Sequence, residues 1–141
     1  MAVAVFAIVT GLDRERAFYP TVLIVIASYY VLFSVMGASR QTLIIESAVA
    51  GAFLVFAVLG FKRNLWLVAG ALIGHGVFDS IHGLFIENPG VPIWWPGFCL
   101  VFDAILGGLL AVRLKKRGLK PATTFRPNVD PEPQRGSRTE R

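Results

Sequence analysis

Charged residues are scarce in this chain of 141 residues: Asp, Glu, Lys and Arg together make up only 16% of it. Hydrophobic residues make up 55%, and the mean hydropathy is +0.62. An average soluble domain has about 25% charged residues, so this composition excludes an ordinary soluble domain and is typical of a polytopic membrane protein. The length allows one compact bundle and leaves no room for a second domain.

Cysteine is almost absent, with Cys99 as the single example. An internal disulfide is therefore excluded, and so is a zinc site built from paired cysteines. The N-terminus has neither the basic region nor the small-residue cleavage site of a secretory signal, so we expect no processing there. Nucleic acid is not an expected partner despite the formal net charge of +5, because the basic residues lie at the ends of apolar runs and in the C-terminal tail.

Long apolar segments dominate the rest of the chain. A helix needs about 20 mostly apolar residues to cross a bilayer, and four segments reach this length: 19–37, 42–61, 65–85 and 97–114. A shorter apolar stretch at 2–10 predicts a short N-terminal helix. The predicted fold is an all-α, polytopic transmembrane helix bundle over residues 1–117. A polar, proline-rich segment at 118–141 is expected to form a disordered cytoplasmic tail.

The basic residues at the ends of these segments predict the orientation in the membrane. If successive segments cross in alternating directions, nine of them lie near one face: Arg14, Arg16, Lys62, Arg63, Arg113, Lys115, Lys116, Arg117 and Lys120. The opposite face has only Arg40. Positively charged loops stay in the cytoplasm. We therefore expect a multi-pass protein of the bacterial cytoplasmic (inner) membrane, with its C-terminus in the cytoplasm and the Trp94–Trp95 pair at the outer interface.

Both histidines and three acids lie inside the predicted spans. His75, Asp79 and His82 follow an i, i+4, i+7 spacing, which puts all three side chains on one face of a helix. They lie roughly 16, 10 and 5 Å below the outer end of their span, and Glu46 and Asp103 lie roughly 6 and 9 Å below the same surface. A charge at the centre of a lone helix costs about 2.5–3.5 kcal/mol. We therefore expect the five residues to converge in one pocket in the outer half of the bundle.

Two imidazoles with up to three carboxylates form a mixed nitrogen and oxygen donor set. Such a set suits a divalent metal, Zn²⁺, Fe²⁺ or Mn²⁺, and the candidate ligands are His75, Asp79, His82, Asp103 and Glu46. Glu46 and Asp103 are also the candidate catalytic residues, with Glu46 as a general base. An open coordination position would allow a bound water to be activated, so a metal-dependent hydrolase is one expectation. Membrane hydrolases of the ceramidase and progestin-receptor-like class are similar in combining His, Asp and Ser at one end of a helical bundle, although their motif order differs and they have more helices.

Two other kinds of function are compatible with the same residues. Intramembrane histidines and carboxylates also move protons, so a proton-coupled transporter or relay subunit is the main alternative. The polar groups can instead hold helices together, as in a non-catalytic membrane assembly partner. The expected partners are membrane lipids and, because the chain is small, further copies in a homo-oligomer.

The order of the polar motifs resembles that of a family of small bacterial integral membrane proteins whose function is not known. The similarity covers roughly residues 11–113 and rests on the following features: D-R-E-R-A-F at 13–18, Glu46, H-x3-D-x2-H at 75–82, N-P at 88–89 and C-x3-D at 99–103. The family often has a second histidine directly after the position of His82, where this sequence has Gly83. The resemblance implies that the polar cluster is a site, without implying a reaction.

Overall fold

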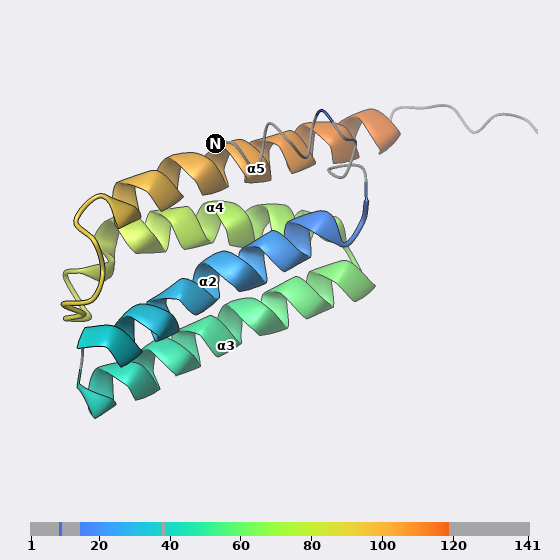
Figure 1. The fold of residues 1–141 in the computed structure, drawn as a ribbon. Helices are drawn as coiled ribbons and strands as arrows, with labels where there is room; N and C mark the ends of the chain where they lie inside the picture. Colours follow the sequence, from blue (N-terminus) through green and yellow to red (C-terminus); the bar gives the residue numbers. More distant parts are fainter. Residues whose placement is uncertain (1–8, 10–14, 38, 119–141) are drawn as a thin grey trace, which may run out of the picture.

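The computed structural model describes residues 9, 15–37 and 39–118, which contain four long α-helices in one bundle (Figure 1). The helices are α2 Phe18–Gly37, α3 Arg40–Lys62, α4 Leu65–His82 and α5 Trp95–Gly118. This confirms the predicted all-α bundle, and α5 runs one residue past the predicted boundary at 117. The predicted N-terminal helix at 2–10, apart from Val9, and the predicted tail from 119 onward lie outside the described residues.

Short turns closed by side-chain caps join the first three of these helices. At the start of α3 the Ser39 hydroxyl accepts a hydrogen bond from the Thr42 backbone N–H at 3.1 Å. At the start of α4 the Asn64 side-chain oxygen accepts one from the Trp66 backbone N–H at 3.0 Å. These caps satisfy backbone donors that have no partner in a preceding turn. With such short connections, consecutive helices run antiparallel (Figure 1).

The third predicted span is too long at its C-terminal end. α4 ends at His82 rather than at 85, because the backbone N–H groups of Leu84 and Phe85 donate to the carbonyls of Ile81 and His82 at 3.0 Å and close a tight turn. Leu84 and Phe85 are 80% and 74% exposed, respectively. Gly83, with its low helix propensity, marks the point where the chain leaves the helix.

α4 and α5 make the most extensive helix contact of the bundle. A Cβ atom added at Gly76 would lie 3.1 Å from both Leu100 Cα and Asp103 Cβ. One added at Gly107 would lie 2.9 Å from the Ala69 carbonyl oxygen. The two backbones therefore approach more closely than any side chain at these positions would allow, which is how small residues pack membrane helices.

The two ends of the bundle differ in charge. Arg16, before α2, donates from Nε and Nη2 to the Phe61 carbonyl near the end of α3, at 2.9 and 2.6 Å. We call this end of the bundle the basic end. The opposite end is formed by residues 83–94 and the turn at Ser39, and we call it the loop end. The directions of the helices bring the following basic residues to the basic end: Arg16, Lys62, Arg63, Lys115, Lys116 and Arg117.

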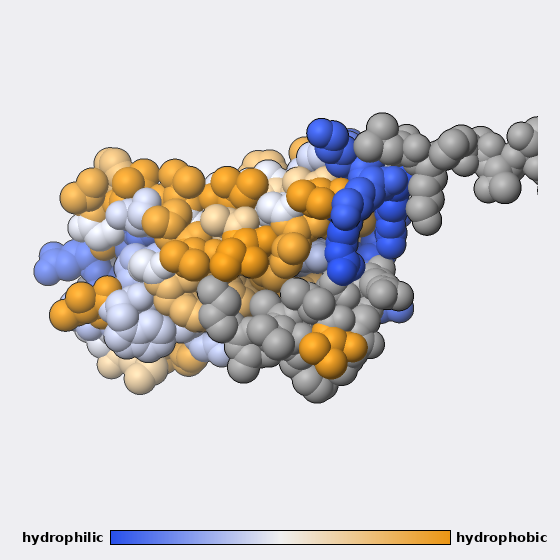
Figure 2. Space-filling view, turned by 90° about the horizontal axis from the view of Figure 1, so that it is seen from above, coloured by the Kyte–Doolittle hydropathy of each residue, from blue (hydrophilic) through white to orange (hydrophobic). Residues whose placement is uncertain are grey.

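The core near the basic end and most of the surface are both apolar. Leu23 of α2, Leu72 of α4 and Leu106 of α5 are at most 2% exposed and belong to one core cluster. Figure 2 shows hydrophobic residues covering the face between the ends, with the strongly hydrophilic residues gathered at the ends. Each of the four helices is long and apolar enough to cross a membrane. The chain is therefore a multi-pass membrane protein whose apolar surface faces lipid.

Candidate metal centre

α4 places three of the five predicted site residues on its buried face. His75, Asp79 and His82 are 2%, 1% and 3% exposed. Toward the basic end the same face continues with apolar residues such as Leu72 and Val68. The i, i+4, i+7 spacing thus turns all three polar side chains into the bundle, as the sequence predicts.

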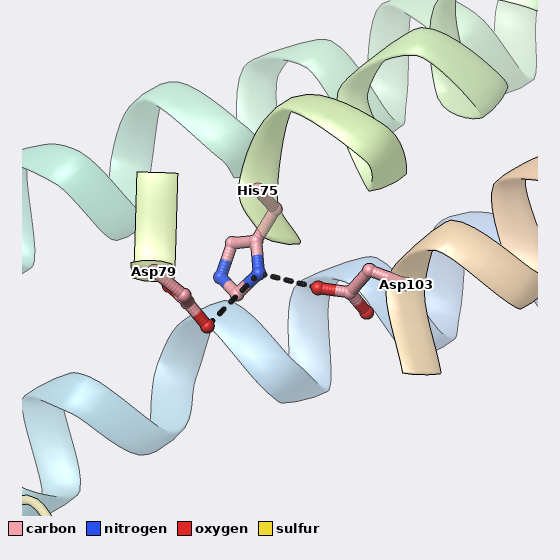
Figure 3. Close-up of side chains that lie close together, drawn as sticks. All are labelled: His75, Asp79 and Asp103. Atoms are coloured by element: carbon pink, nitrogen blue, oxygen red, sulfur yellow. Dashed lines mark hydrogen bonds and ion pairs between the residues drawn. The ribbon is translucent and has the colours of Figure 1, made fainter. Parts of the chain in front are cut away.

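The first polar group consists of His75, Asp79 and Asp103, and we name it the His–Asp–Asp group (Figure 3). His75 Nδ1 lies 2.8 Å from Asp103 Oδ2 and 3.6 Å from Asp79 Oδ2. Each residue offers one ligand atom, and these atoms all lie within 4.8 Å of one another. Asp103 comes from α5, at the level where Gly76 lets the two helices approach.

The carboxylates of this group are poorly satisfied. Both oxygens of Asp79 and Oδ1 of Asp103 are buried without a hydrogen-bond partner among the described residues. The Tyr30 hydroxyl and the Cys99 thiol are the nearest donors to Asp79, and they interact with it as weak hydrogen-bond donors without ideal geometry. A buried carboxylate without a full set of partners is costly in free energy. These free oxygens are therefore where a cation would be stabilised.

The spacing of the donor atoms fits a bound ion. Two ligands that are each about 2.0–2.1 Å from a tetrahedral ion lie about 3.3 Å apart. The separations of 2.8 and 3.6 Å between His75 Nδ1 and the two aspartate oxygens bracket that value. Imidazole and carboxylate are also donors that Zn²⁺, Fe²⁺ and Mn²⁺ accept together. Small side-chain movements would therefore allow the His–Asp–Asp group to hold a divalent metal.

Glu46, His82 and Asn88 form a second polar group nearer the loop end, which we name the Glu46 group. His82 Nε2 lies 2.8 Å from Glu46 Oε1, and the Asn88 side-chain amide donates to the same oxygen at 2.9 Å. The Asn88 amide also donates to Ser34 Oγ at 3.0 Å. Glu46 Oε2, by contrast, is buried and has no partner in the part of the chain that the structure describes. One oxygen of Glu46 is thus fixed while the other is free.

The ring of Tyr30 lies between the two groups. Its centroid is 4.5 Å from the His82 ring and 6.4 Å from the His75 ring. Phe53 packs at 4.7 Å against His75, and Phe78 packs at 5.7 Å against His82. These aromatic walls keep the local dielectric low, so interactions between charges are stronger here than in water.

The structure buries all five predicted site residues but distributes them over two groups. It joins His75, Asp79 and Asp103, and it pairs Glu46 with His82. The contacts of Asn88 could not be predicted from the sequence, although the residue lies in the N-P motif. Its amide reaches Glu46 across 42 positions of sequence, a relation that no local spacing can indicate.

Comparison of the chain with protein-family models, with curated proteins and with solved structures finds no match. Its fold and its site define it as a small helical multi-pass membrane protein with a buried histidine and aspartate group that can hold a metal.

Proposed function

We propose that this protein binds one divalent metal ion in the His–Asp–Asp group. The observation that carries the proposal is that three potential ligand atoms lie within 4.8 Å of one another, beside buried carboxylate oxygens that form no well-aligned hydrogen bond with the described residues. A cation would neutralise these carboxylates and occupy their free oxygens. The mixed donor set favours Zn²⁺, Fe²⁺ or Mn²⁺ over Mg²⁺ and Ca²⁺, which prefer oxygen ligands alone.

The proposed location is the bacterial cytoplasmic membrane, with the basic end and the C-terminus in the cytoplasm. The gathering of basic residues at one end of the bundle supports this orientation. Both polar groups then lie in the half of the bundle that faces the periplasm. Membership in the family with the H-x3-D-x2-H, N-P and C-x3-D pattern is part of the proposal, because the motif residues lie in or beside the two polar groups.

Metal-dependent hydrolysis is the chemistry that we propose for the loaded site. His75, Asp79 and Asp103 would hold the metal with a position left for substrate or water, and the metal would supply the activation of that water. Glu46 is the candidate general base, because His82 and Asn88 hold its Oε1 while no described residue bonds to its Oε2. Asp103 would be a ligand in the loaded site, and in the metal-free protein its Oδ2 holds the imidazole of His75 through Nδ1.

A proton relay is the second candidate function, and two short contacts favour it. The pairs His75–Asp103 and His82–Glu46 each have a nitrogen–oxygen distance of 2.8 Å. Chains of this kind conduct protons inside membranes. In the described part of a single copy, the apolar core around Leu72 separates the two polar groups from the basic end. A transmembrane path for protons would therefore need a homo-oligomer to complete it.

Metal content separates these two functions. We expect detergent-purified protein reconstituted with Zn²⁺ to hold one ion per chain by inductively coupled plasma mass spectrometry. His75→Ala should hold almost none. His82→Ala is the matched control, because it removes the other buried imidazole but leaves the His–Asp–Asp group in place, and it should still hold the ion. Circular dichroism must show that both variants remain helical.

Two results would change the interpretation. If the wild-type protein holds no stoichiometric Zn²⁺, Fe²⁺ or Mn²⁺ at neutral pH, the metal proposal is wrong and the relay becomes the better explanation. If His75→Ala and His82→Ala both lose the ion, the two groups rearrange so that all five residues serve one metal.

A further inference from the structure

A cleft at the loop end leads toward the Glu46 group. It has a volume of about 330 Å³ and is lined by the end of α4, the following loop and the start of α5. His82 and Asn88 both line this cleft, and both form a hydrogen bond with Glu46 Oε1 in the protein interior. Glu46, 1% exposed, therefore lies directly behind the residues that form the cleft wall.

Glu46 has the features of a residue that receives a cation. Its Oε1 is held by His82 and Asn88, so the carboxylate cannot turn freely. Its Oε2 is buried and accepts no hydrogen bond from residues 15–37 or 39–118. A cation can bind to Oε2 without breaking either hydrogen bond to Oε1, and no proton has to leave His82. Burial behind the cleft keeps the attraction strong, because little water screens it.

The Glu46 group continues into the His–Asp–Asp group. Tyr30 packs against His82 on one side, and its hydroxyl interacts with Asp79 on the other. His82 and His75 share one face of α4 and are about 10 Å apart along the helix axis. Beyond His75 the same face becomes apolar at Leu72. In the described part of the chain, a succession of polar side chains thus extends from the cleft lining to the His–Asp–Asp group and ends there.

We propose that the Glu46 group is a loading site, through which a divalent cation passes from the loop-end cleft to the His–Asp–Asp group. The inference rests on the proposed metal function and adds the side and the route of loading to it. Glu46 binds the passing cation through Oε2. His82 and Asn88 are positioning residues that keep this oxygen available. The ion comes from the aqueous phase at the loop end.

Binding kinetics in detergent test this role, with Co²⁺ as the probe because its visible absorption reports coordination. In Glu46→Gln we expect the association and dissociation rates to fall together by at least tenfold, with an unchanged dissociation constant. A residue on the path lowers the barrier in both directions without altering the final site. The amide side chain of this variant keeps an oxygen that accepts from Asn88, so the local structure can persist.

Two further variants sharpen the measurement. Glu87→Gln is the matched control: it removes the same charge from the cleft lining, but Glu87 is exposed, and both rates should stay within about twofold. Asn88→Ala removes one of the two hydrogen bonds to Glu46 Oε1. Because Asn88 is half-buried and lies in a loop, this variant tests the same role if Glu46→Gln does not fold. We expect it to slow both rates, again with an unchanged dissociation constant.

The outcomes separate the loading role from the metal proposal itself. If Glu46→Gln weakens the affinity through faster dissociation alone, Glu46 is a ligand of the final site and the loading role is wrong. If neither rate changes in Glu46→Gln and Asn88→Ala, the route does not pass through this group. If wild-type protein and His75→Ala bind Co²⁺ equally, or neither binds it, the proposed function has failed and not merely the route.

Discussion

At the residue scale, Asp79 is the residue that most favours the proposed metal site. It is 1% exposed, and within the described segments its oxygens form no well-aligned hydrogen bond and have only weaker contacts with Tyr30, Cys99 and His75. Asp103 differs, since its Oδ2 has a contact of 2.8 Å with His75 Nδ1. A residue kept only to hold helices together would have its hydrogen bonds made. We therefore expect Asp79 to destabilise the metal-free protein, as a residue retained for function often does.

This difference predicts opposite effects of two isosteric substitutions on the metal-free protein. Asp79→Asn removes a buried charge that Tyr30 and Cys99 stabilise only weakly, and it should raise the free energy of unfolding by roughly 1–3 kcal/mol. Asp103→Asn weakens the hydrogen bond between His75 and a charged acceptor, so it should lower the free energy of unfolding by a similar amount. Both should abolish stoichiometric metal binding. Unfolding of chelator-treated protein in detergent, followed by tryptophan fluorescence, measures the two effects, and a loss of stability in Asp79→Asn would contradict the interpretation.

At the scale of elements, α4 and α5 together build the His–Asp–Asp group. α4 supplies two potential ligands from one face, and α5 brings the third across a contact at which a Cβ on Gly76 would lie 3.1 Å from Asp103 Cβ. The short distance between these helices is therefore a condition for the contact between His75 and Asp103. Gly74, only two residues away, has open space around its Cα.

The two glycines provide a matched pair of substitutions on one helix. Gly76→Ala should push α5 away, destabilise the bundle by about 1–3 kcal/mol as overpacking does, and weaken metal binding. Gly74→Ala adds the same methyl group into open space and should be neutral or stabilise α4 by up to about 1 kcal/mol. Unfolding in mixed detergent micelles and metal titration give both readouts. Equal effects of the two substitutions would show that close packing at Gly76 is not required.

At the scale of the whole molecule, charge and hydropathy define how the bundle lies in a membrane. The basic residues gather at one end, and an apolar surface covers the face between the ends (Figure 2). The loop end exposes residues such as Ile93 and Trp94, of which the tryptophan is suited to the headgroup region. In the orientation that we propose from the positive-inside rule, the loop end faces the periplasm, together with the cleft that leads to the Glu46 group.

Cysteine labelling in intact cells tests this orientation. Ile93→Cys should react with a membrane-impermeant thiol reagent, whereas Thr123→Cys should react only after the cells are lysed. Ile93 is fully exposed, while any side chain at Gly90 would collide with the backbone of Phe33, so Ile93 is the better position. The unsubstituted protein is the control, because Cys99 is buried. The reverse labelling pattern would place the cleft in the cytoplasm.

The sequence by itself determined the number, type and approximate bounds of the described helices and the buried face of α4. Apolar length and helical period are local properties, so they can be read without knowing what a segment contacts. The same local counting also gave depths along the membrane axis. Glu46 and His82 were placed roughly 6 and 5 Å deep, and the structure pairs them. Expecting all five residues in one pocket went beyond what depth alone can indicate.

Tertiary structure decided which acid meets which histidine. Depth follows from counting residues along a helix, but lateral position and rotation about the helix axis depend on how neighbouring helices pack. The close contact at Gly76 brings Asp103 to His75. The turn that ends α4 at His82 lets the following loop fold back and place Asn88 on Glu46. Both relations join residues far apart in the chain, and they exist only because packed side chains and backbone fix the helices against one another.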